Sequence, residues 1–295
     1  MPSYPFVTVD VFTERRFGGN PLAVFPDAAG ISDGDMQALA AEFNLSETTF
    51  VLPPDDPAHT AKVRIFTTTR ELPFAGHPNV GTGYVLAQLG RDDAGSLLFE
   101  EKAGLVEVCV ERAQDGSVAG ATIAAPQPLS VGMTLPPDLV AACAGLHVSE
   151  IVLSAHPPVW ASVGNPFVLV EVDAEALSRA SPELGAFREA VRQLPALEGW
   201  LDIYLYARGP GAVRTRMFAP LMGIWEDPAT GSAATTLAAL LLSHIGDERH
   251  AFDILQGVEM GRPSLLRATA HRAVDGIRSG VGGRCVTVLR GEALL

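Results

Sequence analysis

The sequence predicts an α+β fold of two pseudo-symmetric lobes, each a curved, mostly antiparallel, barrel-like sheet around a central helix. Two observations support this prediction. A series of turn, strand and helix signals in the first half recurs in the same order after residue 126, which indicates an internal duplication. Each series also contains a helix that is apolar on nearly every face, in "GTGYVLAQLG" and in "TTLAALLLSHI", and such a helix must be surrounded by other elements.

The first half opens with a strand at residues 6–12, which is rich in β-branched and aromatic residues, and a second strand is expected directly after the turn of Gly19, Asn20 and Pro21. A helix is expected to begin at Ser32, where Asp35 completes a capping pattern, and to end at Asn44, a residue suited to the left-handed conformation. Between these caps, apolar residues recur at helical spacing. Further strands are expected at "ETTFVL", "AKVRIFT", "SLLFE", "GLVEVCVE" and "VAGATIAAP", with the first apolar helix between the second and third of them.

The second half restarts the series with a glycine-asparagine-proline turn. "GNPFVLV" at residues 164–170 restates "GGNPLAVF" at residues 18–25. A helical region over residues 176–192, the strands "YLYAR" and "VRTRMFAP", and the second apolar helix follow in the same order. We therefore expect an N-terminal lobe of residues 1–127 and a C-terminal lobe of residues 128–295, and we allow the last strand to cross back to the N-terminal lobe.

Composition argues against several classes of function. The chain has a formal net charge of −13 at pH 7, and an acidic surface repels nucleic acid and anionic lipid. No signal segment is visible, and the longest apolar run is too short to cross a bilayer. Three scattered cysteines fit a reducing cytoplasm. No metal-ligand cluster or nucleotide-binding glycine motif is evident, so we expect a cytoplasmic protein with no metal or cofactor and with no nucleic-acid or membrane partner.

Each repeat carries a stiff polar corner just ahead of its apolar helix. His77 stands between Gly76 and Pro78, and Asp227 stands before Pro228. The first N–H groups of a helix lack intrahelical partners and carry a partial positive charge, so two such helix starts suit a small carboxylate. An imidazole held on such a corner is placed to give, take or orient a proton. Asp227 is equally consistent with a helix cap.

Small residues at the starts of these helices have two interpretations. Gly81, Gly83 and Gly231 are expected to let a ligand approach the backbone closely. Ser232, just inside the second apolar helix, is either a capping hydroxyl or a ligand donor.

Glu47 is a third candidate, because "NLSETTFVL" places it between a helix and a strand. Rigid elements often present functional side chains at such junctions. We expect apolar neighbours to raise the pKa of this carboxyl and to suit it to proton transfer near neutral pH. On pattern alone, a solvated carboxylate at a strand end explains Glu47 as well.

Taken together, these residues resemble the PhzF-like family of phenazine-biosynthesis isomerases, within the diaminopimelate epimerase superfamily. The resemblance rests on "VDVFTERRFGGNPLAVF", "NLSETTFVL", "FTTTRELPFAGHPNVGTG", "RMFAPLMGIWEDPATGSAA" and "ILQGVEMGRPSL", which together extend over most of the chain. It implies two lobes of the diaminopimelate epimerase-like fold with the active site between them, a homodimer, and neither metal nor organic cofactor.

The resemblance also implies a reaction. The family enzyme isomerises trans-2,3-dihydro-3-hydroxyanthranilate: a glutamate moves a proton from ring C3 to C1, and the resulting enol relaxes to a ketone. Glu47 matches that glutamate, and His77 and Asp227 match the family's histidine and aspartate as further catalytic residues.

For substrate binding, Ser232 matches the family's serine, and the backbone at Gly76 and Gly231 matches the positions that contact the substrate carboxylate region. The epimerases of the superfamily use one cysteine from each lobe, and this chain has none at either corner. We therefore expect a cofactor-independent isomerase that shifts a proton on a small carboxylate. Two alternatives stay open: an epimerase or racemase of a small amino or hydroxy acid that uses His77 and Glu47, and a non-catalytic metabolite-binding protein.

Overall fold

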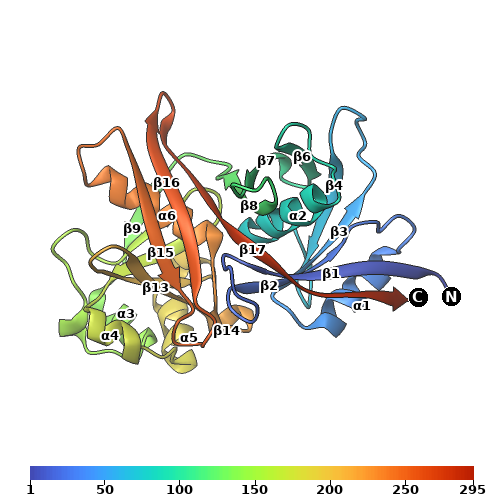
Figure 1. Cartoon of the computed structure of the whole chain (residues 1–295). Helices are drawn as coiled ribbons and strands as arrows, with labels where there is room; N and C mark the ends of the chain where they lie inside the picture. Colours follow the sequence, from blue (N-terminus) through green and yellow to red (C-terminus); the bar gives the residue numbers. More distant parts are fainter. The chain divides into compact units, whose positions relative to one another are not determined.

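The chain folds into two compact units in the computed structural model, which describes all 295 residues. Unit 1 comprises Met1–Ala124 and Val281–Leu295, and unit 2 comprises Ala125–Gly280 (Figure 1). The sequence placed the boundary after residue 127 and allowed the last strand to cross back. The last strand, β17 (Gly276–Leu294), begins in unit 2 and continues into unit 1.

Unit 1 contains two helices and eight strands in addition to its share of β17. They are β1 (Ser3–Val11), β2 (Asn20–Phe25), α1 (Asp33–Phe43), β3 (Glu47–Leu52), β4 (Ala61–Phe66), β5 (Glu71–Leu72), α2 (Gly76–Gln88), β6 (Ser96–Glu101), β7 (Gly104–Arg112) and β8 (Val118–Ala124).

Eight strands close into a barrel in unit 1. Antiparallel pairs join β1 to β2, β3 to β4, β6 to β7, and β7 to β8, and parallel pairs join β2 to β3 and β4 to β6. Strand β17 completes the ring, since it pairs with both β8 and β1. Closure leaves no open edge in this ring, so every strand has a neighbour on both sides. The fold class expected for this half is confirmed.

Helix α2 lies inside this barrel, where it contacts β1, β2, β3, β7 and β8. Every residue from Gly76 to Ala87 is buried, which explains why this helix is apolar on all faces. The expectation that Gly81 and Gly83 admit a ligand is wrong. A Cβ atom at Gly81 would lie 2.6 Å from Leu22 Cδ2, and one at Gly83 would lie 2.6 Å from Val108 Cγ1. These glycines let the helix pack closely against the barrel wall.

This packing predicts a stability effect for Gly81→Ala. The added methyl group would meet Leu22 and also Val11, whose Cγ2 atom would lie 2.8 Å from it. Overpacking of this kind costs about 1–3 kcal/mol, so the variant should have a lower thermal midpoint than the natural protein. Gly185→Ala is the matched control, because no heavy atom lies within 4 Å of that position and alanine favours the helix. Equal midpoints for the two variants would contradict this explanation of the α2 glycines.

Helix α1 has the caps that the sequence indicates. The Ser32 hydroxyl accepts a hydrogen bond from Asp35 N at 3.1 Å, and Asn44 ends the helix in the left-handed conformation at φ 51°. Met36 and Ala40 are buried against an aromatic cluster that includes Phe25. Burial of this apolar face holds α1 against the barrel strands.

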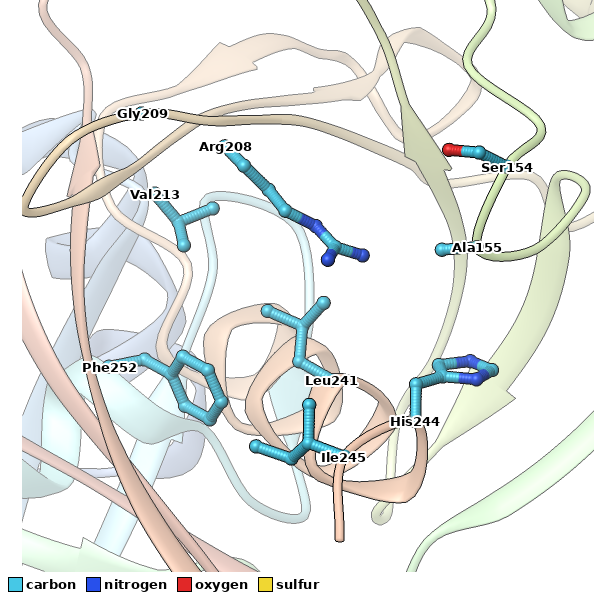
Figure 2. Close-up of a pocket in the computed structure, with 9 residues that line it drawn as sticks. All are labelled: Ser154, Ala155, Arg208, Gly209, Val213, Leu241, His244, Ile245 and Phe252. Atoms are coloured by element: carbon cyan, nitrogen blue, oxygen red, sulfur yellow. The ribbon is translucent and has the colours of Figure 1, made fainter. Parts of the chain in front are cut away.

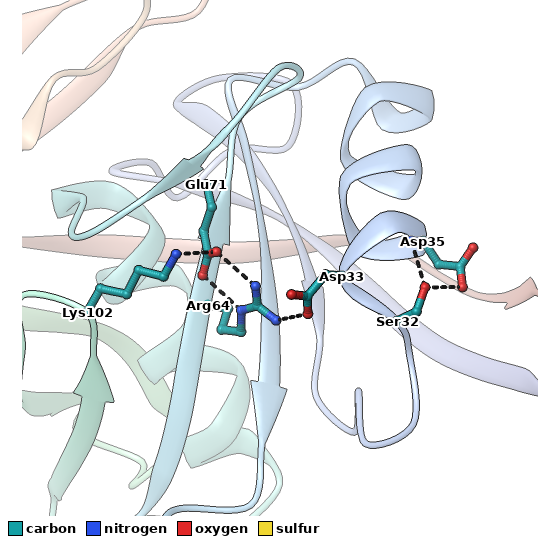
Figure 3. Close-up of polar contacts among 6 residues, drawn as sticks. All are labelled: Ser32, Asp33, Asp35, Arg64, Glu71 and Lys102. Atoms are coloured by element: carbon teal, nitrogen blue, oxygen red, sulfur yellow. Dashed lines mark hydrogen bonds and ion pairs between the residues drawn. The ribbon is translucent and has the colours of Figure 1, made fainter.

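An ion-pair cluster fixes the segment that leads to α2 (Figure 3). Arg64 donates two hydrogen bonds to the Glu71 carboxylate, each 2.8 Å long, and also donates to Asp33. Lys102 adds a second cation at 2.6 Å from Glu71. The Arg64 guanidinium is the main cause that holds the pKa of Glu71 below its usual value. The bidentate contact with Arg64 restrains Glu71 in β5, and it therefore also restrains the corner that follows β5.

Unit 2 contains four helices and a second set of strands. They are β9 (Ser130–Thr134), α3 (Pro137–Cys143), β10 (Val159–Ser162), β11 (Pro166–Glu171), α4 (Ala174–Arg179), α5 (Leu184–Gln193), β12 (Ile203–Arg208), β13 (Val213–Ala219), β14 (Ile224–Asp227), α6 (Gly231–Ser243), β15 (Arg249–Gln256) and β16 (Ser264–Ala273).

Unit 2 repeats the order and pairing of unit 1, which supports the internal duplication. The pair β10–β11 is antiparallel like β1–β2, and β11–β12 is parallel like β2–β3. The pair β12–β13 is antiparallel like β3–β4, and β13–β15 is parallel like β4–β6. Helix α6 occupies the place of α2, contacts β10, β11, β15 and β16, and is almost entirely buried. Both helices span 13 residues.

The helical region expected over residues 176–192 is two helices, so that prediction was wrong in detail. Helix α4 ends at Arg179 and α5 begins at Leu184. Pro182 lies in the break, where its ring disfavours a helical conformation of the preceding residue. None of the helices in the structure combines the length and apolar character needed to span a bilayer.

Candidate active site

The predicted site residues form two clusters, one in each unit. In unit 1, His77 is the second residue of α2, so it lies in the first turn of the helix and not before it as expected. Pro78 follows within the same turn, where a missing N–H costs no intrahelical bond. Ala75 is the N-cap and supplies no side-chain hydrogen bond. Because no side chain caps α2, its first N–H groups, beginning with that of Gly76, are suited to an anion.

Glu47 and His77 meet in this cluster. Glu47 is the first residue of β3 and pairs in register with Leu22 of β2. Its Oε2 atom lies 3.4 Å from Nδ1 of His77, and the two side chains are 14% and 6% exposed. Asn20, the first residue of β2, brings its Nδ2 atom to 3.5 Å from the same His77 nitrogen. The structure thus brings the predicted site residues Glu47 and His77 together with the buried side-chain amide of Asn20.

Burial dominates the protonation of His77. It lowers the pKa of the imidazole to about 3, while a hydrogen bond with the Pro21 backbone acts in the opposite direction. His77 is therefore neutral near pH 7. A neutral imidazole has one donor and one acceptor nitrogen, so it can orient Glu47 either as a carboxylate or as a carboxylic acid.

The second cluster surrounds the start of α6. Asp227 is the last residue of β14, and its Oδ2 atom accepts a hydrogen bond from the Thr230 hydroxyl at 2.6 Å. Thr230 is the N-cap of α6, although its side chain makes no capping bond. Asp227 and Thr230 are each 7% exposed. The corner therefore holds its carboxylate in a fixed direction.

Gln256 at the end of β15 fixes this corner. Its Nε2 atom donates to the Asp227 carbonyl at 2.8 Å and to Thr230 Oγ1 at 2.9 Å, and its Oε1 atom accepts from Thr230 N at 3.1 Å. The Tyr204 hydroxyl lies 3.0 Å from Gln256 Oε1 and 3.0 Å from Thr215 Oγ1. A fully bonded buried network of this kind rigidifies its surroundings.

Sequence reasoning did not select Asn20 or Gln256 as site residues. In the sequence, Asn20 belongs to a repeated turn, and Gln256 lies within the stretch "ILQGVEMGRPSL". The repeated turn was a usable signal for Asn20, because a glycine-asparagine-proline turn recurs at residues 164–166. No local pattern marks Gln256, whose partners lie 26 to 52 residues away in sequence.

Gly231 and Ser232 are the first two residues of α6. Gly231 is buried, in the place that Gly76 has in α2. Ser232 is partly exposed, and its hydroxyl makes no hydrogen bond within the chain, while its carbonyl accepts from Thr235 and Thr236 at 2.8 Å. The hydroxyl is thus available to a ligand, and it does not act as a cap.

Glu101 is a further buried carboxyl near α2. Burial raises its pKa to about 8, and a hydrogen bond with Asn79, in the first turns of α2, partly opposes that shift. Its folded-state pKa lies above the usual 4.5, so its contribution to stability is fully present below about pH 4.5 and is lost as the pH rises through about 8.

Glu101→Gln should therefore change the pH dependence of stability. The variant cannot ionise at this position, so it should exceed the natural protein in thermal midpoint at about pH 9 and match it at about pH 4. The gain at the higher pH is of the order of a few kcal/mol, because one pKa unit corresponds to about 1.4 kcal/mol. Thermal melts at both pH values measure this, and a gain that is the same at both would show that ionisation is not the cause.

Comparison with known proteins identifies the family. The model of the family described as phenazine biosynthesis-like protein (PhzC-PhzF) matches residues 9–291. A Mesorhizobium japonicum protein named uncharacterized isomerase mll1393 is 38% identical over an alignment of 307 positions, gaps included, which covers 100% of each chain. The trans-2,3-dihydro-3-hydroxyanthranilate isomerase of Pseudomonas chlororaphis is 38% identical over an alignment of 299 positions, gaps included, which covers 98% of this chain and 99% of the relative.

A solved structure supports the same assignment of fold. The phenazine biosynthesis protein of the PhzF family from Bacillus anthracis superposes with a TM-score of 0.89 and 24% identity, and the match covers 100% of both chains. The family match extends over nearly the whole chain, and these two relatives, which match over 99–100% of their own length, are named as isomerases. The chain therefore belongs to the phenazine biosynthesis-like (PhzC-PhzF) family, and it is an isomerase.

Proposed function

We propose that this isomerase shifts a proton on a small cyclic carboxylate related to trans-2,3-dihydro-3-hydroxyanthranilate, the compound in the name of its Pseudomonas chlororaphis relative. The observation that carries the proposal is the contact of 3.4 Å between Glu47 Oε2 and His77 Nδ1 at the uncapped start of α2. A mostly buried carboxylate beside a neutral imidazole is a proton carrier with a fixed orientation.

Glu47 is the proton carrier in this proposal. It takes a proton from one ring carbon, becomes a carboxylic acid, and returns the proton to a second carbon, after which the enol relaxes to a ketone. His77 stays neutral throughout, because burial keeps the pKa of its imidazole at about 3. It therefore orients the Glu47 carboxyl and does not compete with it for the proton.

Asp227, Ser232 and the helix starts hold the substrate. The Ser232 hydroxyl has no partner within the chain, and the N–H groups that follow Gly76 and Gly231 favour an anion at each helix start. Asp227 orients a polar group of the substrate from the corner that Gln256 fixes. This assignment requires that both clusters contact the same substrate molecule during turnover.

The geometry favours a proton shift over epimerisation. An epimerase with two bases needs them on opposite faces of one carbon, so that one removes a proton and the other delivers a proton from the far side. Glu47 and His77 come from the same unit and lie 3.4 Å apart, so they approach a substrate from the same direction. A single proton carrier, Glu47, that moves a proton between two carbons on the same face of the substrate fits this arrangement.

We also propose the cellular context of the enzyme. Its three cysteines are free thiols, which supports a cytoplasmic location. The reaction needs only protein acid and base groups, so we propose that it proceeds without a metal or organic cofactor. A homodimer stays a prediction of the family resemblance, and light scattering behind size-exclusion chromatography would test it by showing twice the chain mass.

Incubation with trans-2,3-dihydro-3-hydroxyanthranilate in heavy water tests the reaction. We expect loss of the starting compound and formation of an isomer. Mass spectrometry and NMR then show which carbon has gained a hydrogen or deuterium atom. Deuterium uptake at a chiral carbon without migration of the proton would indicate an epimerase instead. A compound that binds but undergoes neither change would indicate a metabolite-binding protein and contradict the proposal.

A further inference from the structure

Unit 2 contains a pocket that the proposed reaction does not use. It has a volume of about 480 Å³ and includes Leu241, His244 and Ile245, at the C-terminal end of α6 (Figure 2). Ser232 lies nine residues before Leu241 on the same helix, so at 1.5 Å per residue the two positions are separated by about 14 Å. The volume is within the range of small-ligand sites, which is roughly 300–1,000 Å³.

The lining combines an apolar surface with a few polar groups. Leu241, Ile245 and Phe252, with Val213, supply apolar side chains, and Figure 2 shows the Arg208 guanidinium extending over Leu241 towards Ala155. This combination is typical of ligand pockets, in which apolar area supplies affinity and convergent polar groups set orientation.

Arg208 is held in place by a mostly buried carboxylate. Its Nε atom lies 3.0 Å from Glu171 Oε1 and its Nη2 atom lies 3.2 Å from Glu171 Oε2. The Arg208 side chain is nevertheless 48% exposed, while that of Glu171 is 10% exposed. Glu171 accounts for two of the five N–H groups of the guanidinium, so donors remain for a ligand in the pocket.

Behind this pair is a buried polar chain that reaches the opposite edge of the pocket. The Tyr206 hydroxyl lies 3.2 Å from Glu171 Oε2 and 2.7 Å from Nε2 of His156. The His156 ring stacks on His244 with centroids 5.6 Å apart and an interplanar angle of 12°. Buried polar groups cost stability unless they are bonded, so this chain is a preorganised support for the two basic side chains at the pocket.

The helix end that forms the apolar surface is also fixed. Arg272 donates from Nη2 to the Leu242 carbonyl at 3.3 Å and to the Ile245 carbonyl at 3.0 Å. A cation at a helix C-terminus compensates the helix dipole and bonds carbonyls that lack intrahelical partners. The pocket is therefore built from side chains on restrained elements.

Charge selects the kind of ligand. Glu171 neutralises much of the Arg208 charge, and its buried carboxylate repels a doubly charged ligand such as phosphate more strongly than a singly charged one. A single carboxylate can take the planar donor face of the guanidinium that Glu171 leaves open. We propose that this pocket binds a small monocarboxylate with an apolar body, at a site separate from the cluster at the start of α6.

Benzoate is a suitable probe, and benzamide is its neutral control. Isothermal titration calorimetry of the whole protein should show benzoate binding and at least about tenfold weaker benzamide binding, because the charge-assisted hydrogen bonds are lost. Arg208→Gln should reduce benzoate affinity by a similar factor. Ala155→Phe, which leaves the Arg208–Glu171 pair intact, should block the pocket. Ser232→Ala tests whether benzoate binds at the start of α6 instead.

The variants separate the alternatives. The expected pattern is a benzoate affinity about tenfold lower in Arg208→Gln, loss of binding in Ala155→Phe, and unchanged binding in Ser232→Ala. The thermal midpoint of each variant shows whether it is folded, and the Ala155→Phe result decides the matter if Arg208→Gln is unstable. Benzoate binding that survives Ala155→Phe, is lost in Ser232→Ala, or does not occur in the natural protein would overturn the proposal. The test is independent of the isomerase reaction.

Discussion

Replacement of Glu47 by glutamine will reduce kcat by about 10³-fold or more while leaving ligand binding nearly unchanged. Glutamine keeps the shape of the side chain and its place at the start of β3, but it cannot accept and return a proton. A single acid-base group typically contributes about 10²–10⁴-fold, and a group that both removes and delivers the proton is expected at the upper end. Steady-state kinetics with trans-2,3-dihydro-3-hydroxyanthranilate and calorimetric binding of the product measure the two effects separately.

Glu42→Gln is the matched control for this variant. Glu42 is an exposed carboxylate near the end of α1, five residues from Glu47, and it should be replaceable without effect on kcat. A Glu47→Gln variant with full kcat would remove this residue from the mechanism. A variant that loses binding and turnover together would show instead that Glu47 positions the substrate.

Gly257→Ala will cause the largest loss of stability among the glycine substitutions considered. Gly257 follows Gln256 and adopts φ +73°, and a Cβ atom there would lie 2.5 Å from the carbonyl oxygens of both Pro228 and Arg262. A left-handed conformation alone costs an alanine about 1–2 kcal/mol. The contacts with two backbone oxygens cannot be relieved by a side-chain rotation, so we expect a total loss of at least about 3 kcal/mol.

The same substitution should reduce activity, because Pro228 directly follows Asp227. Gly261→Ala separates the two causes, since Gly261 has φ +71° and no heavy atom within 4 Å of its Cβ position. The Gly261→Ala control should lose only the stability that the left-handed conformation costs an alanine. Thermal or urea unfolding measures both variants, and equal losses would show that the contacts with Pro228 and Arg262 carry no cost.

Local signals in the sequence were sufficient for local structure. Ser32, Asp35 and Asn44 fixed both ends of α1, since caps depend on bonds between residues close in sequence. The apolar helices were placed inside sheets because an all-apolar helix has no stable alternative. The break between α4 and α5 was not predicted, although Pro182 lies in it and disfavours a helical conformation of the residue before it.

The residues that hold the site residues in place could not be predicted, because their contacts join residues that are distant in sequence. Gln256 bonds to Thr230 and to Tyr204 across strands that are brought together only by the fold. The role of Gly81 was misread for the same reason: its neighbour Leu22 is distant in sequence, and only packing shows that the space beside Gly81 is filled by the barrel. Residues that carry chemistry could be proposed from motifs, whereas the residues that hold them could not.

The proposed reaction requires Glu47 and His77 to act with Asp227 and Ser232 on one bound molecule. A crystal structure of the Glu47→Gln variant grown with trans-2,3-dihydro-3-hydroxyanthranilate would show whether they do. We expect one ligand whose carboxylate contacts Ser232 or the N–H groups of a helix start, with position 47 within hydrogen-bonding reach of the reacting carbons and Asp227 on a polar substituent. A ligand bound to one cluster alone, with the other cluster open to solvent, would refute the shared site.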